Sequence, residues 1–259
     1  NDKQKVAITQ DGQKEALEHA GRTGGLPFVG VGWYRLNFEA PAFSSGKKAT
    51  LIFDGAMSHA RVYINGQEAG FWPYGYNSFH IDATPYLKAG EQNTLAVRLE
   101  NETESSRWYP GAGLYRNVHL IVTDKIHVPV WGTQITTPHV SKEFAAVRLQ
   151  TRIDNAGEKT QIRMETEILS PDGKVVTRKE NTGRINHGQP FEQNFIVNAP
   201  ELWSPENPSL YKAVSKIYAN NKLVDTYTTR FGIRSIEFIA DKGFYLNGEH
   251  RKFQGVCNH

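Results

Sequence analysis

The chain has 259 residues, of which 39% are hydrophobic and 22% charged, a globular composition with enough apolar residues for a sizeable core. Its formal net charge of +3 comes from scattered lysines and arginines, which excludes a nucleic-acid-binding patch, and no apolar run approaches the ~20 residues of a membrane helix. The single cysteine, Cys257, excludes a disulfide framework within the chain and a zinc site built on several cysteines. One cysteine suits a cytosolic and a periplasmic protein alike.

In chain order, the first predicted element is a turn or two of helix in residues 13–20 (QKEALEHA). From Gly32 onward the hydrophobic period is mostly two, which indicates strands. Asn65-Gly66 favours a type I′ turn, so residues 60–71 (ARVYINGQEAGF) predict a hairpin. Further strands are expected in residues 33–41 (WYRLNFEAP), 49–55 (ATLIFDG), 93–101 (NTLAVRLEN) and 117–124 (NVHLIVTD). Turn signals at the spacing of a β-sandwich separate these strands.

Residues 124–140 (DKIHVPVWGTQITTPHV) mark a seam, after which a second run of strands begins. About seven strands over about 110 residues match the size of an immunoglobulin-like domain, and the absence of a cysteine pair excludes an antibody-type core. Beyond Arg234, Asn247-Gly248 predicts another tight hairpin, and residues 252–256 (KFQGV) predict a further strand. The second run comprises residues 145–157 (AAVRLQTRIDNAG), 161–176 (QIRMETEILSPDGKVV), 190–200 (PFEQNFIVNAP) and 210–234 (LYKAVSKIYANNKLVDTYTTRFGIR). The fold class expected from these patterns is all-β.

Four segments in this order resemble glycoside hydrolase family 2, the group of bacterial β-galactosidases and β-glucuronidases. They are residues 23–38 (TGGLPFVGVGWYRLNF), 62–87 (VYINGQEAGFWPYGYNSFHIDATPYL), 107–120 (RWYPGAGLYRNVHL) and 231–259 (FGIRSIEFIADKGFYLNGEHRKFQGVCNH). Residues 202–211 (LWSPENPSLY) are also similar to the end of the second domain of that family. The resemblance covers nearly the whole chain.

The resemblance implies a domain order. Residues 1–124 would form a jelly-roll, galactose-binding-like sandwich, residues 125–234 an immunoglobulin-like sandwich, and residues 235–259 the entry hairpin and first strand of a (β/α)8 (TIM) barrel. A whole barrel needs roughly 250 residues. We therefore expect an N-terminal fragment that lacks the catalytic barrel and that is trimmed at its N-terminus as well.

Members of that family hydrolyse β-glycosides with retention, and two carboxyl groups about 5–5.5 Å apart share the work. The resemblance places both glutamates on later barrel strands, so no catalytic residue is assigned here and the fragment is expected to be inactive. The parent protein is expected to be a β-galactosidase-like hydrolase of terminal β-linked sugars. The alternatives are a stand-alone pair of carbohydrate-binding modules and an adhesin-like pair of sandwiches.

The substrate-binding candidates come from the resemblance. His259 and Asn258 would end the first barrel strand, where the histidine hydrogen-bonds a sugar hydroxyl; Asn258 stands where many members have arginine, and Cys257 where many have asparagine. Trp108 and Tyr109 lie in a loop that reaches toward the barrel mouth in the family, and they would stack on a sugar ring. The alternatives are a frayed terminal residue for His259 and a core residue for Trp108. Two further aromatic residues, Trp72 and Tyr74, are weaker candidates for sugar contact.

No cofactor is expected. Some members bind sodium through an aspartate just before the tryptophan of this loop, whereas the chain has Ser105, Ser106 and Arg107 there, which does not support a cation site. The expected partner is a β-linked glycan or galactoside in the full-length enzyme, with no nucleic acid and no membrane, and homo-oligomerisation stays open. A periplasmic or extracellular location is slightly favoured over a cytoplasmic one.

Overall fold

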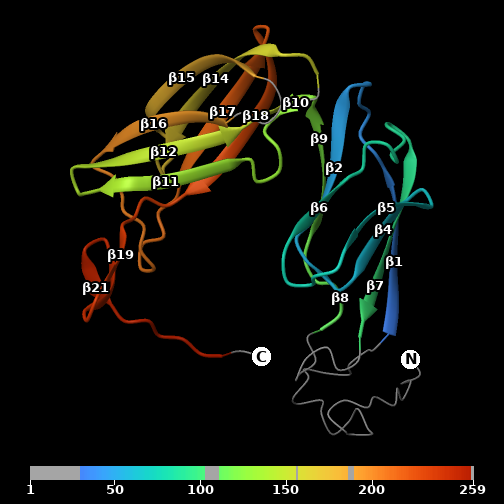
Figure 1. Ribbon diagram of the computed structural model, residues 1–259, viewed down its shortest axis with the longest axis horizontal. Helices are drawn as coiled ribbons and strands as arrows, with labels where there is room; N and C mark the ends of the chain where they lie inside the picture. The colour runs from blue at the N-terminus through green and yellow to red at the C-terminus, as the bar shows by residue number, and fades with distance from the viewer. Residues whose placement is uncertain (1–29, 103–110, 156, 186–189, 258–259) are drawn as a thin grey trace, which may run out of the picture. The chain divides into compact units, whose positions relative to one another are not determined.

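The computed structural model describes residues 30–102, 111–155, 157–185 and 190–257 (Figure 1). Within these ranges the chain forms strands β1 to β21 and no α-helix, which confirms the predicted all-β class. The described residues contain no helix long and apolar enough to cross a membrane. The helix predicted for residues 13–20 lies outside the described residues. The chain divides into two compact units between Val122 and Thr123.

The first unit contains a four-stranded sheet in the order β1-β7-β4-β5, a three-stranded sheet in the order β6-β2-β9, and the short pair β3-β8. The predicted hairpin is confirmed as β4 and β5, which are joined at Asn65 (φ 52°) and Gly66 (φ 83°). The strands are β1 (Gly30–Glu39), β2 (Lys47–Phe53), β3 (Ala56–Met57), β4 (Ala60–Ile64), β5 (Gln67–Trp72), β6 (Phe79–Asp82), β7 (Gln92–Asn101), β8 (Gly113–Leu114) and β9 (Val118–Asp124).

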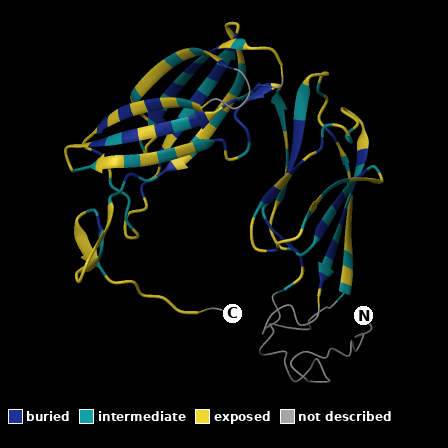
Figure 2. Ribbon diagram, in the orientation of Figure 1, coloured by how far each residue is buried: buried dark blue, intermediate teal, exposed yellow. Residues whose placement is uncertain are grey.

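Alternation along the strands builds the core of this unit (Figure 2). On β7, Leu95, Val97 and Leu99 are buried, whereas the residues between them are partly exposed. The buried residues join one cluster with Phe53 and Phe79, whose rings stack 4.8 Å apart. Because successive side chains of a strand point to opposite faces, the four-stranded sheet presents its other set of side chains outward. The sandwich predicted for this half of the chain is thus confirmed.

The second unit contains seven long strands within the described residues, in sheets of order β11-β12-β16 and β15-β14-β17-β18, and the short pair β10-β13. Two buried clusters, one around Leu149 and Ile168 and one around Met164 and Ile217, form its core. The strands are β10 (Ile126–His127), β11 (Thr133–Val140), β12 (Phe144–Arg152), β13 (Asp154–Asn155), β14 (Thr160–Leu169), β15 (Val175–Ile185), β16 (Pro190–Asn198), β17 (Tyr211–Ala219) and β18 (Lys222–Phe231).

Strand β11 lies in the stretch that the sequence assigns only to a seam. Its residues alternate poorly, and Pro138 within it argues against a central strand. In the structure β11 is the edge strand of its sheet, and its register with β12 shifts between Thr136 and His139, around the proline. An edge position and an irregular register tolerate a residue without an N–H donor.

A small three-stranded sheet ends the described chain: β19 (Ile236–Ile239), β20 (Gly243–Leu246) and β21 (Glu249–Arg251). The predicted turn is present at Asn247 (φ 53°) and Gly248 (φ 79°). The Asn247 side chain accepts a hydrogen bond from the Ser235 amide at 3.0 Å and donates one to the Trp203 carbonyl oxygen at 3.0 Å. These bonds hold the hairpin to the segment that precedes β17.

The prediction of a strand in residues 252–256 is wrong. Strand β21 ends at Arg251, and residues 252–257 have no regular structure. Phe253 is 76% exposed and Val256 93% exposed. An extended segment becomes a strand only when a neighbour receives its backbone hydrogen bonds, and none of the described strands pairs with this one. The Phe253 ring instead packs against that of Phe244, 4.6 Å away.

We expect Gly232→Ala to destabilise the second unit by about 1–3 kcal/mol. A Cβ atom at Gly232 would lie 2.8 Å from Cβ and 2.9 Å from Cγ of Trp203. Those atoms adjoin the Trp203 backbone, whose amide donates to the Ile233 carbonyl at 2.8 Å, so the ring cannot rotate away freely. Urea unfolding measures the effect. Gly183→Ala is the matched control, because its Cβ would meet Phe191 at an ordinary 3.4 Å; equal losses in both variants would contradict the prediction.

Candidate functional site

The four substrate-binding residues predicted from the sequence, Trp108, Tyr109, Asn258 and His259, lie outside the described residues. Their predicted roles therefore stay predictions. The segment that carries Trp108 and Tyr109 lies between two described residues, Glu102, which follows β7, and Gly111.

The two weaker aromatic candidates have different environments. Trp72 belongs to the core of the first unit: its ring stacks on Phe79 at 5.6 Å, and its Nε1 donates to Asn77 Oδ1 at 3.0 Å. This packing leaves little of the ring for a ligand. Tyr74 is 57% exposed, and its ring lies 5.6 Å from that of Tyr76, so this pair remains accessible.

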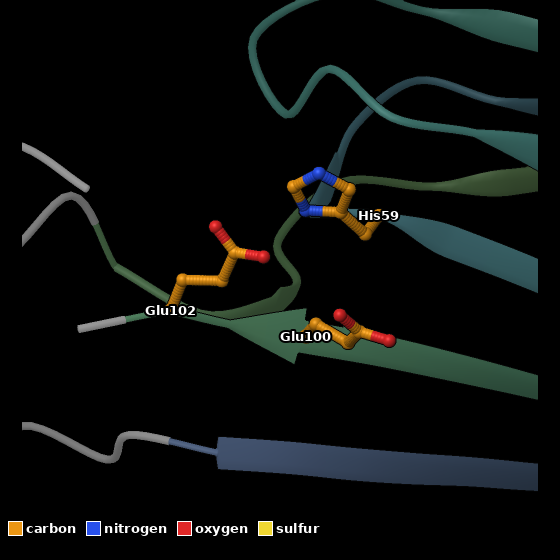
Figure 3. A group of neighbouring side chains, drawn as sticks. All are labelled: His59, Glu100 and Glu102. Carbon is orange, nitrogen blue, oxygen red and sulfur yellow. The ribbon is translucent and has the colours of Figure 1, made fainter.

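A cluster of three polar side chains lies at the end of β7 (Figure 3). His59 precedes β4, Glu100 is on β7, and Glu102 follows that strand. Each offers one ligand atom, and these atoms all lie within 4.8 Å of one another. Ser58 adjoins the cluster: its hydroxyl is 3.2 Å from His59 Nδ1 and donates to the Glu100 carbonyl oxygen at 2.8 Å.

Arginine side chains control the charge of this cluster. Arg98 forms an ion pair and hydrogen bond with the Glu100 carboxylate and thereby lowers the pKa of that group, while partial burial acts in the opposite direction. The neighbouring His59 and Arg61 side chains add smaller contributions to the lowering of the Glu100 pKa. Glu100 consequently stays ionised further into the acid range than an ordinary glutamate.

Two carboxylates this close invite comparison with a retaining glycosidase pair. Such a pair needs a general acid whose pKa is raised so that it holds a proton near neutral pH. Glu100 has the reverse property, because Arg98 favours its ionised form. Glu100 therefore cannot serve as the proton donor of such a pair.

An imidazole and two carboxylates are a donor set that divalent cations such as Zn²⁺ or Mn²⁺ accept. His59, Glu100 and Glu102 are accordingly the described residues that could hold a metal ion. Arg98 competes with an ion for Glu100, and all three side chains are at least partly exposed. The same groups can also donate and accept hydrogen bonds with sugar hydroxyls.

This cluster was not predicted from the sequence, although two of its three residues carry a signal. Glu100 and Glu102 have the i, i+2 spacing that places two side chains on one face of a strand. His59 belongs to a separate part of the chain, and only the pairing of β4 with β7 brings it near. Nothing in the local pattern around His59 predicts that approach.

A cavity of about 370 Å³ opens between β1 and β9, the edge strands of the two sheets in the first unit. Its lining is mainly aliphatic and aromatic, and the polar members are Arg35 and His119. His119 is already paired, with its Nε2 3.1 Å from Asp54 Oδ2. The cavity therefore offers apolar contact but few groups that would orient a ligand.

Comparison with protein families matches both units. The model described as "Glycosyl hydrolases family 2, sugar binding domain" matches residues 27–124, and the model described as "Glycosyl hydrolases family 2" matches residues 128–234. The order of the two models agrees with the order that the sequence resemblance implies.

Individual relatives agree with these matches. The chain is 41% identical to β-galactosidase BoGH2A of Bacteroides ovatus over 93% of its own length and 29% of the relative. It is 38% identical to a protein named putative β-glucuronidase of Formosa agariphila, over 92% of the chain and 23% of the relative. A solved glycosyl hydrolase family 2 member from Bacteroides cellulosilyticus superposes with a TM-score of 0.87 at 35% identity, over 92% and 31% of the two chains. The chain thus spans less than a third of these proteins.

Proposed function

Since the chain belongs to glycosyl hydrolase family 2, we propose that it is the N-terminal, non-catalytic part of a longer retaining β-glycosidase. The observation that carries the proposal is the match of both non-barrel modules, in order, to enzymes more than three times as long. The full-length protein would hydrolyse terminal β-linked sugars, and this part would supply the scaffold that holds the catalytic domain.

We propose a β-galactosidase-like specificity because the relative at 41% identity is a β-galactosidase. A β-glucuronidase is the second candidate, since relatives at 38% and 34% identity carry that name. The proposed domains are residues 1–124, 125–234 and 235–259. In the full-length protein His259 would hydrogen-bond a sugar hydroxyl beside Asn258, and Trp108 and Tyr109 would stack on a sugar ring.

The test is an assay of the isolated 259-residue chain with nitrophenyl β-galactoside and nitrophenyl β-glucuronide. We expect no turnover above the blank, because a retaining mechanism needs two catalytic carboxyl groups, and the family resemblance assigns both to strands of a catalytic barrel that this part of the protein is proposed not to include. The positive control is the full-length protein, which should cleave one of the two substrates. Activity of the chain that survives repurification and is lost in Glu100→Gln would overturn the assignment as a non-catalytic part.

A further inference from the structure

The outward face of the four-stranded sheet in the first unit carries a row of four large side chains. Trp33 on β1 pairs with Arg98 on β7, Arg98 with Arg61 on β4, and Arg61 with Phe71 on β5. Directly paired residues of neighbouring antiparallel strands point to the same face. Val62, Val97 and Leu99 of these strands are buried in the core, so this row, which we call the outer row, faces away from it.

The aromatic members of the outer row are open to solvent. The Trp33 side chain is 60% exposed and Phe71 is 45% exposed. Tyr63 lies one row further along, on the same face, and its ring is 5.6 Å from that of Trp33 at an angle of 36°. Ala96 on β7 pairs with Tyr63, and its small side chain leaves room for the two rings to meet across that strand. The face therefore has exposed aromatic rings toward both of its edges, Trp33 and Tyr63 toward β1 and Phe71 on β5.

Paired charges fill the space between the rings. Arg61 Nη1 is 3.0 Å from Glu68 Oε1, and its guanidinium lies 4.8 Å from the centre of the Phe71 ring. The Tyr63 hydroxyl donates to Glu68 Oε2 at 3.3 Å, and Arg98 is paired with Glu100. Each pair presents a guanidinium donor next to a carboxylate acceptor. A sugar hydroxyl donates and accepts at once, so adjacent donors and acceptors suit its hydrogen-bonding needs.

We propose that the outer row, together with Tyr63 and Glu68, binds a neutral β-linked oligosaccharide. Apolar faces of pyranose rings would stack on Trp33 and Phe71, and their hydroxyls would bond the Arg–Glu pairs. Three strand spacings separate β1 from β5, a distance of about 14 Å, which exceeds a single sugar ring. The ligand is therefore an oligosaccharide and not a monosaccharide. The family model described as a sugar binding domain covers every residue of this face.

The paired charges of the outer row favour a neutral ligand there. In that row Arg61 and Arg98 are each neutralised by a glutamate, whereas Arg35, one row further along on β1, adds a positive group at that edge of the face. A uronate chain would have to displace Glu68 or Glu100 to pair with Arg61 or Arg98. This binding activity does not depend on the proposed hydrolase, because it needs no catalytic carboxylate.

The test is calorimetric titration of the 259-residue chain with cellotetraose, with β-1,4-galactotetraose and with a tetrauronate, and in parallel with glucose and galactose. We expect at least one tetrasaccharide to bind with a dissociation constant below about 1 mM, and both monosaccharides to bind at least about tenfold more weakly. Trp33→Ala and Phe71→Ala should each weaken tetrasaccharide binding about tenfold, because each removes one stacking surface. Trp33→Phe keeps a ring and should stay within about threefold of the parent chain.

Phe238→Ala is the matched control, because it removes a ring that is 75% exposed in the other unit, and it should leave binding unchanged. Circular dichroism verifies folding; if Trp33→Ala unfolds, Phe71→Ala decides the test. The proposal is overturned if neither tetrasaccharide binds with a dissociation constant below about 1 mM. It is also overturned if Phe238→Ala weakens binding as much as Phe71→Ala, or if only a tetrauronate binds. Glycosidase activity and tetrasaccharide binding are measured separately. A chain that binds a tetrasaccharide without hydrolysing the nitrophenyl glycosides, or that hydrolyses them without binding, therefore tells apart the failure of one proposal from the failure of the other.

Discussion

Phe53→Ala should destabilise the first unit by about 3–5 kcal/mol, the largest loss expected from a single substitution in that unit. Phe53 is fully buried on β2, and its ring stacks almost parallel on Phe79, with centroids 4.8 Å apart and planes 4° apart. Phe79 in turn stacks on Trp72. Removing the Phe53 ring leaves a cavity. The neighbouring strands cannot move in to fill it, because backbone hydrogen bonds hold them in their sheets.

Hydrogen exchange followed by mass spectrometry measures this effect by segment. Peptides within residues 47–101 should lose protection, while peptides within residues 145–231 should keep it, because the two units have separate cores. Phe71→Ala is the matched control: it removes the same side chain from an exposed position and should change stability by no more than about 0.5 kcal/mol. Uniform loss of protection in both segments would contradict separate cores.

Ile217→Ala should destabilise the second unit by about 2–5 kcal/mol. Ile217 on β17 is fully buried and belongs to the cluster that also contains Ile162, Met164 and Ile185. These neighbours come from β14 and β15, so the cavity would be lined by residues of β14, β15 and β17, three strands of one sheet. Dispersion contacts and apolar burial are both lost there, and β-branched neighbours cannot reorient to recover them.

Ile196→Ala provides the comparison for this second prediction. Ile196 is on β16 of the same unit, but 52% of it is exposed, so its truncation should cost no more than about 0.5 kcal/mol. Urea titrations measure the free energy of unfolding of each variant. Hydrogen exchange of peptides within residues 145–231 then shows whether the loss lies in the second unit. Equal losses would mean that burial at Ile217 does not govern stability.

Strand identity could be predicted wherever side chains alternate between a core and solvent. Strand β7 is an example, because buried and more exposed residues alternate along it, with Leu95, Val97 and Leu99 on the buried side. The turns at Asn65-Gly66 and Asn247-Gly248 were equally predictable, since both need positive φ angles that asparagine and glycine adopt. Edge strand β11 was missed because its pattern is weak and contains a proline. The strand expected at residues 252–256 failed because local pattern cannot supply a pairing partner.

The outward face of the first unit shows a different limit. Arg61 and Phe71 belong to the hairpin that the sequence predicts, but the sequence gives no signal for the register shift between Val62 and Tyr63 or for the approach of Trp33. Only the register of β1, β7, β4 and β5 places them in one row. The cluster of His59, Glu100 and Glu102 depends on the same register.

The sequence by itself determined that this protein is all-β, that it has two sandwich units, and that it belongs with the glycosyl hydrolases of family 2. Those properties follow from periodicity, turn residues and motifs, which are local along the chain. The tertiary structure alone decided which side chains share a face, which aromatic rings are core and which are open, and where the last strand ends. These depend on strand register and on the presence of a neighbouring strand, and a one-residue change in register would send every side chain of a strand to the opposite face.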